Sequence, residues 1–172
     1  VTFTPDWVGG GFTYSTEYGF AGATELAFSD ILGNHQIYFS SDLFSNVTES
    51  NFVLQYWYLP RRVNMGAALF QEKYFYLTSD ASILEEKLYG GASLFSYPLD
   101  KFRRVDLELS AYAIQQSYIW ARGGTWWKRE GGRGEIFIPT LSFVRDTAIW
   151  GSTGPVAGTR SRIAAGKSAK LT

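Results

Sequence analysis

The segment Phe102–Gln116 constrains the fold of this chain more than any other part of the sequence, because polarity alternates along it residue by residue. The apolar positions are Val105, Leu107, Leu109, Ala111 and Ala113. The intervening polar positions are Arg104, Asp106, Glu108, Ser110 and Tyr112. Successive side chains on a strand point to opposite faces, so this period of two predicts a strand with one apolar and one charged face. Such a strand lies either between hydrocarbon and a wet interior, or between a protein core and bulk water.

The composition narrows the class of protein. The 172 residues are enough for one domain, and 17% of them are aromatic while only 19% are charged. The formal net charge is zero, so there is no electrostatic case for binding nucleic acid. No cysteine is present, which excludes disulfides and thiolate chemistry. No apolar run reaches the roughly 18 residues that a transmembrane helix needs, but membrane strands give a much weaker signal and are not excluded.

The whole sequence is predicted to be all-β, an antiparallel up-and-down meander of about nine strands. Runs of alternating or aromatic residues, separated by turn residues, define the strands. The predicted strands are Thr2–Ser15, Phe20–Ser29, His35–Leu43, Asn51–Leu59, Val63–Tyr76, Glu86–Tyr97, Phe102–Trp120, Glu135–Trp150 and Thr159–Lys170.

The connections between these strands alternate in length, as expected when successive loops lie at opposite ends of a meander. Long loops are predicted at Phe44–Ser50, Leu77–Glu85 and Ala121–Gly134. Tight turns are predicted at Asp30–Asn34, Pro60–Arg62, Pro98–Lys101 and Gly151–Gly158. Transmembrane barrels have short periplasmic turns and longer outer loops, so the alternation favours a membrane barrel with the long loops outside.

Aromatic residues near strand ends also favour a membrane barrel, because aromatic girdles mark both membrane interfaces. The girdle candidates are Trp57, Tyr58, Tyr74, Tyr76, Tyr97, Trp120 and Trp150. Within this interpretation Val105, Leu107, Leu109, Ala111 and Ala113 face lipid, and Arg104, Asp106 and Glu108 are lumenal charges. A water-soluble, lipocalin-like barrel with the aromatic residues in its core is the alternative.

Three local features could suggest other chemistry. The glycines at 9–11 lack the following helix of a phosphate loop, so a bulge or a close backbone approach is expected there. His35 is the only histidine and has no clustered ligands, so we expect neither a metal nor another cofactor. Asp106 and Glu108 lie beside Arg104, which favours a charge network over catalytic carboxylates, and we expect no enzyme.

Pro139 falls inside a strand and predicts a bulge or a locally unpaired site.

Four segments carry a resemblance to a known family. They are FSDILGNHQIYFSSDL at 28–43, LQYWYLPRRVNMGAALFQ at 54–71, YGGASLFSYPLDKFRRVDLELS at 89–110 and PTLSFVRDTAIWGSTGPVAGTRSRIAAG at 139–166. Together they resemble the bacterial surface antigen family, whose barrel is shared by BamA-like outer-membrane assembly factors. That barrel has sixteen strands, so the resemblance implies that residues 1–172 are an outer-membrane β-barrel domain, the N-terminal portion of a larger barrel.

The resemblance also implies a function and a location. We expect a protein of the Gram-negative-type outer membrane that supports membrane-protein assembly or translocation. Its expected partners are outer-membrane lipid, the remaining barrel strands or another barrel chain, and client β-strands. A passive pore or structural barrel is the first alternative, and a soluble ligand-binding β-barrel is the second.

Overall fold

The computed structural model describes residues 1–16, 19–44, 50–59, 62–78, 82–122, 124–152 and 154–171. These residues form twelve strands. They are β1 (Phe3–Ser15), β2 (Gly19–Asp30), β3 (His35–Phe44), β4 (Asn51–Tyr58), β5 (Asn64–Leu77), β6 (Ile83–Pro98), β7 (Arg103–Arg122), β8 (Thr125–Asp146), β9 (Ile149–Gly151), β10 (Gly154–Ala157), β11 (Arg160–Gly166) and β12 (Ala169–Lys170). Within the described ranges, no helix is long and apolar enough to cross a membrane.

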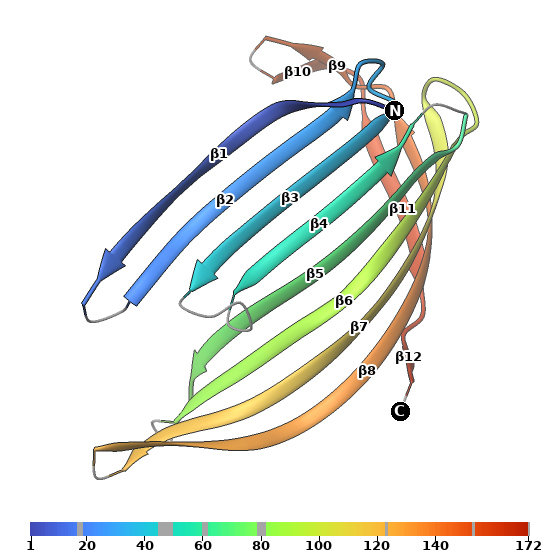
Figure 1. The fold of residues 1–172 in the computed structure, drawn as a ribbon. Coiled ribbons are helices and arrows are strands. Elements are labelled where there is room, and N and C mark those ends of the chain that lie inside the picture. Colours follow the sequence, from blue (N-terminus) through green and yellow to red (C-terminus); the bar gives the residue numbers. More distant parts are fainter. Residues whose placement is uncertain are drawn as a thin grey trace.

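The strands form one curved antiparallel meander, which confirms the predicted fold class. The main sheet runs in chain order from β1 to β8 and continues with β11, while β12 pairs with the same strand as β11, namely β8 (Figure 1). The nine predicted strands therefore correspond to β1–β8 and to β11 together with β12. Among the described residues β1 and β11 do not pair with each other, so the sheet is open.

The two ends of the sheet differ in the length of their strands. We call the end where β7 begins, at Arg103, the turn end, and the end where β7 finishes, at Arg122, the hairpin end. Strands β5, β6, β7 and β8 lengthen progressively, from 14 to 16, 20 and 22 residues. The β7–β8 hairpin consequently extends far beyond its neighbours, and its tip is the lowest point of Figure 1.

The predicted loop at Ala121–Gly134 is wrong, because most of it is strand. Strand β7 continues to Arg122 and β8 already begins at Thr125, with Gly124 in the connection at a φ of 79°. Pairing extends out to Arg122 and Thr125, with one register shift between Gln115 and Ser117. The glycines at 131 and 132 lie opposite this shift, where a bulge absorbs an extra residue.

The predicted alternation of long and short loops also fails. At the hairpin end, β6 begins at Ile83 rather than after Glu85, so the connection from β5 spans only 78–82. The longest connection lies at the turn end, where 147–159 contains the separate two-stranded sheet of β9 and β10 instead of a simple turn at Gly151–Gly158. Strand β8 accordingly ends at Asp146 and not at Trp150. Of the predicted loops, residues 45–49, 60–61, 79–81, 123 and 153 lie outside the described residues.

Pro139 produces an unpaired site but no bulge. It is in regular register with Leu109 of β7. Its carbonyl oxygen accepts a hydrogen bond of 3.4 Å from the backbone N–H of Lys167, on the opposite side of β8. The N and O atoms of a strand residue point to the same neighbour, so the missing donor of Pro139 faces the last strands. There β11 ends at Gly166 and β12 begins at Ala169, which leaves a break in the ladder.

Among the glycines at 9–11, Gly10 lies at a close backbone approach, one of the two predicted alternatives. A Cβ atom at Gly10 would lie 2.8 Å from the carbonyl oxygen of Ala23 on β2. The register shift of this strand lies elsewhere, between Pro5 and Trp7. The turn at Asp30–Asn34 is confirmed: the Asp30 carboxylate accepts a hydrogen bond of 2.9 Å from the backbone N–H of His35, and Gly33 has a φ of 68°.

The described part of the sheet has almost no hydrophobic core. Ala113 and Val144 are its only fully buried apolar residues, at 7% and 2% exposure. Folded domains of comparable length normally bury many apolar side chains completely. Stability must therefore come from the hydrogen-bonded ladders and from whatever covers the two faces of the sheet.

Candidate functional site: an apolar face and a polar face

The five predicted lipid-facing residues of β7 lie on one side of the sheet, which we call the apolar face. In register with Val105, Leu107 and Leu109 are Tyr97, Phe95 and Ser93 of β6 and Phe143, Leu141 and Pro139 of β8. The same face continues through Met65, Ala67 and Leu69 of β5. Large side chains on it remain accessible, with Leu69 at 57% and Leu141 at 55% exposure. The face is thus a broad apolar surface that nothing in this chain covers among the described residues.

Charged and polar residues bound this surface at both ends. On β7 the apolar stretch from Val105 to Ala113 covers nine residues, with Arg103 before it and Gln115 after it. Arg103 is in register with Arg145 of β8, and Ala113 is in register with Glu135. A membrane strand needs roughly 9–11 residues to cross the hydrocarbon, so the length of the stretch matches one crossing.

The opposite side of the sheet, the polar face, carries the three predicted lumenal charges. Asp106 is only 6% exposed, accepts a hydrogen bond of 2.6 Å from the Ser96 hydroxyl, and pairs with the Arg104 guanidinium at 3.2 Å. Glu108 does not join this pair; it accepts a hydrogen bond of 3.1 Å from the Ser110 hydroxyl. The structure therefore divides the predicted charge network into two neighbouring groups on one face.

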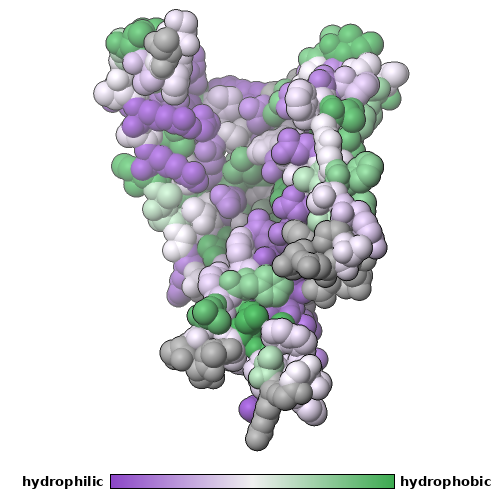
Figure 2. Space-filling model, turned by 90° about the vertical axis from the view of Figure 1, so that its left-hand side faces the viewer, coloured by the Kyte–Doolittle hydropathy of each residue, from purple (hydrophilic) through white to green (hydrophobic). Residues whose placement is uncertain are grey.

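The two faces are also distinct in the overall shape of the molecule. Seen from the side of β1, hydrophilic residues gather around the hollow of the trough and hydrophobic residues occupy its outer flanks (Figure 2). The polar face thus lines the hollow, and the apolar face is turned outward.

The seven predicted girdle aromatics are distributed over both faces. Register with the residues of β7 places Tyr58 and Tyr97 on the apolar face. It places Trp57, Tyr74, Tyr76 and Trp120 on the polar face, and Trp150 lies in the separate β9–β10 hairpin. Of the seven, only Tyr58 and Tyr97 share the apolar face of the main sheet with the predicted lipid-facing residues. On the polar face, the Trp57 ring lies against Gly66, where an added Cβ would come within 2.6 Å of it.

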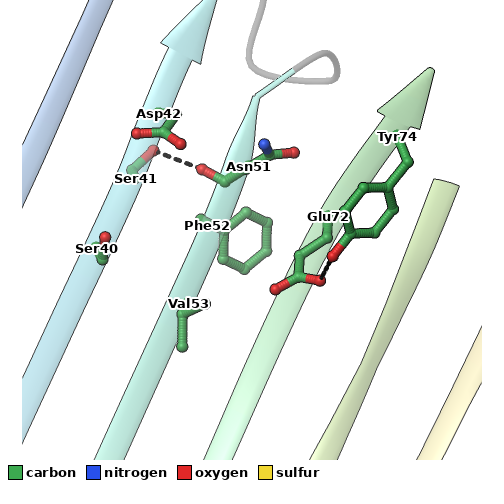
Figure 3. Close-up of a pocket in the computed structure, with 8 residues that line it drawn as sticks. All are labelled: Ser40, Ser41, Asp42, Asn51, Phe52, Val53, Glu72 and Tyr74. Carbon is green, nitrogen blue, oxygen red and sulfur yellow. Dashed lines mark hydrogen bonds between the residues drawn. The ribbon is translucent and has the colours of Figure 1, made fainter. Parts of the chain in front are cut away.

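A small hollow of about 190 Å³ near the hairpin end carries two carboxylates, Asp42 and Glu72 (Figure 3). The Tyr74 hydroxyl donates a hydrogen bond to Glu72, and the Ser41 hydroxyl donates one of 3.1 Å to the carbonyl oxygen of Asn51. In the described ranges, no group of three or more His, Cys, Asp or Glu side chains is placed to hold a metal ion. His35 lies among aromatic rings, with its Nδ1 2.7 Å from the Tyr56 hydroxyl.

Sequence reasoning missed one cluster, formed by Lys73 of β5, Glu85 of β6 and Lys128 of β8. The Glu85 carboxylate is 3.0 Å from the Lys73 ammonium and 2.9 Å from that of Lys128. The side chains of Lys73 and Glu85 are only 4% and 8% exposed. The register places this outer charged cluster on the apolar face, just past its limit at the hairpin end. Glu85 and Lys128 belong to segments predicted as loops, so no sequence signal brought the three together.

Comparison with protein-family models finds none that matches, and searches of curated proteins and of solved structures return no match. The two faces and the two edges of the sheet are therefore the features from which a function can be inferred.

Proposed function

We propose that this chain forms part of an outer-membrane β-barrel of the surface-antigen type, with the apolar face against lipid and the polar face toward a wet lumen. The observation that carries the proposal is the apolar stretch of β7, which has the length of one membrane crossing and is bounded by Arg103 at one end and by Gln115 at the other. The matching apolar positions on β5, β6 and β8 extend it into a band. A band of about 25 Å is the mark of the outer surface of such barrels.

The orientation of the two faces argues against a soluble ligand-binding barrel. Such a barrel encloses its apolar side chains and turns its polar ones to water. In this protein the polar residues lie around the hollow of the trough formed by the whole sheet, and the apolar residues lie on its outer side (Figure 2). In water that arrangement would leave Leu69, Leu107 and Leu141 solvated.

The edges of the sheet support a role in strand addition, and hence in membrane-protein assembly or translocation. Neighbouring strands in the series from β1 to β8 and β11 are antiparallel, so the first and the ninth strand run in the same direction. Direct closure would join β1 to β11 in parallel, whereas an antiparallel closure needs an odd number of further strands. In hydrocarbon an unpaired backbone group costs several kcal/mol, so each edge is a template for a strand. The remaining barrel strands, another barrel chain or a client β-strand would supply it.

A passive pore is the second candidate function, and the charges of the polar face favour it. Arg104, Asp106 and Glu108 would line the lumen and set its selectivity for ions. Ion conductance that is independent of any client would support the pore, whereas cross-links between β1 and client strands would support assembly.

The natural absence of cysteine makes the membrane proposal directly testable. The variants Leu109→Cys and Ser110→Cys place one label on each face at adjacent positions. After reconstitution into vesicles whose acyl chains carry a quencher, the label at 109 should be quenched strongly and the label at 110 weakly. Equal quenching at the two positions would contradict the assignment of the faces.

A further inference from the structure

The outer charged cluster surrounds a hollow of about 170 Å³ on the apolar face. Its charged lining consists of Lys73, Lys87 and Lys128 against Glu85 and Glu130, which gives a formal excess of one positive charge. The hollow is larger than one water molecule needs. Lys128 is half exposed, and an ammonium group carries three N–H donors, so an anion can approach it from the open side.

The position of this hollow is that of a lipid headgroup. On β6, Lys87 is the next residue on the apolar face after Tyr89, and on β7, Gln115 is the next after Ala113. The hollow therefore begins where the apolar band ends. On the same face of β8, Trp126 follows Lys128 toward the tip and is 68% exposed. Tryptophan concentrates at the level of the headgroups, which agrees with this placement.

An apolar groove of about 480 Å³ lies nearer the middle of the same face, lined by residues of β4, β5, β6 and β7. Its floor is low because Ala67, Gly91 and Ser93 are small, and Leu54, Leu69 and Leu109 are among the larger residues that line it. On β5 the groove residue Leu69 and the hollow residue Lys73 are four positions apart, about 13 Å at the usual rise per residue. The charged hollow and the groove thus lie on one face, with Gln71 and Tyr89 between them.

We propose that the hollow and the groove together bind one phosphate-bearing lipid. Its phosphate lies against Lys87 and Lys128, and one of its acyl chains lies in the groove beside Leu69. This inference rests on the proposed membrane function, because only there does the apolar face meet lipid. The ion pairs of Glu85 with Lys73 and Lys128 fix both ammonium groups, so the positive side of the hollow is preorganised for an anion. Charge complementarity favours a phosphate headgroup with a net negative charge over a zwitterionic one.

The test measures the selectivity of the full chain for spin-labelled phosphatidic acid over spin-labelled phosphatidylcholine in vesicles. Lys87→Gln and Lys128→Gln should each lower this selectivity about five-fold, the share expected for one lysine near an anionic surface. Ser93→Leu fills the groove and should weaken the association of both lipids. Lys101→Gln, at the turn end, is the matched control and should leave the selectivity unchanged.

Two results would overturn the inference while leaving the membrane proposal intact. The first is a selectivity for phosphatidic acid that stays at the wild-type value in all four variants, while stronger quenching at position 109 than at position 110 shows that the chain is inserted. The second is full competition by inorganic phosphate, which would assign the hollow to a free anion. If the labels at 109 and 110 report no insertion, the membrane proposal fails and the lipid site fails with it.

Discussion

Two parts of β7 have the same backbone structure and different surroundings. From Val105 to Ala113 the strand pairs on both sides and presents an unbroken apolar face. Beyond Gln115 it continues as a paired strand to Arg122, and charged residues of the neighbouring strands then lie beside the same face: Glu85 of β6 is in register with Ser117, and Lys128 of β8 with Ile119. At the tip, Trp126 and Trp127 are 68% and 54% exposed. Both parts of β7 are therefore held as strand by backbone hydrogen bonds to β6 and β8. The alternation of polar and apolar side chains, by contrast, depends on the surroundings of the two faces.

The largest expected effect is that of a charge placed within the apolar stretch. Leu107→Arg should destabilise the membrane-inserted state by about 2–4 kcal/mol, because arginine on a lipid-facing position near the midplane must leave water. Folding titrations into vesicles measure the difference. Ser110→Arg, on the polar face, and Ile119→Arg, on the apolar side but beyond Gln115, should cost much less. Similar costs at positions 107 and 119 would remove the distinction between the two parts of β7.

A smaller effect is expected from adding one methyl group to a glycine. Gly90 of β6 lies beside β7, and a Cβ atom there would be 2.3 Å from the carbonyl oxygen of Ala111 and 2.5 Å from the Cβ of Tyr112. Gly90→Ala should therefore cost about 1–3 kcal/mol, since the strands must separate to admit it. Gly132, opposite the bulge in the extended hairpin, has its nearest neighbour at 4.0 Å, the Gln116 side chain.

Gly132→Ala should accordingly change the stability by no more than about 0.5 kcal/mol. Urea unfolding of both variants in the same vesicles gives the comparison. If the two substitutions are equally costly, the close approach of β7 to Gly90 does not determine the cost of the added methyl group.

The smallest effect concerns the turn that precedes β7. The Asp100 carboxylate accepts hydrogen bonds from the backbone N–H groups of Phe102 and Arg103, at 2.8 and 2.9 Å, and pairs with the Arg103 guanidinium at 2.6 Å. The Phe102 N–H first, and then Arg103, lower the pKa of Asp100 below its ordinary value. Folding therefore favours the ionised carboxylate. The stabilisation is complete above the unfolded pKa of about 3.9 and is lost as the pH falls through the lower folded pKa.

Acid titration of the stability of the wild-type chain and of Asp100→Asn tests this turn. The stability difference between the two proteins should be constant near neutral pH and should shrink below about pH 4. A difference that does not depend on pH would mean that the charge of Asp100 does not stabilise the turn.

The fold class could be predicted because alternation is strongest where the two faces meet different surroundings, as at Leu107 and Glu108. The same reasoning fails for the extended hairpin, where Lys128 and Arg129 on opposite faces are both polar. The glycines at 131, 132 and 134 are typical of a loop sequence, but those at 131 and 132 lie in a bulge of the paired strand. The Gly123-Gly124 pair is typical of a two-residue hairpin and is the one signal that could have located the turn.

The candidate site was predictable in part. The faces of β7 follow from the sequence alone, so Asp106 and Leu107 could be assigned to opposite sides before the structure. The orientation of Trp57 and Tyr74 could not be, because aromatic residues near a strand end occupy either face. The cluster of Lys73, Glu85 and Lys128 depends on the register of four strands, and that register includes the bulge after Gln115.

The break opposite Pro139 determines how the last edge of the sheet can come apart. Strand β11 contributes seven register pairs to β8, from Arg160 to Gly166, and β12 contributes two, at Ala169 and Lys170. Pro139 supplies no N–H between these two stretches, so its carbonyl oxygen, which accepts from the Lys167 N–H at 3.4 Å, is the group of Pro139 that joins them. We therefore expect the two-pair stretch of β12 to open at a lower free energy than the seven-pair stretch of β11. Its opening would uncover the Ile136–Phe137 backbone of β8, so the last edge would offer strand pairing in two stages.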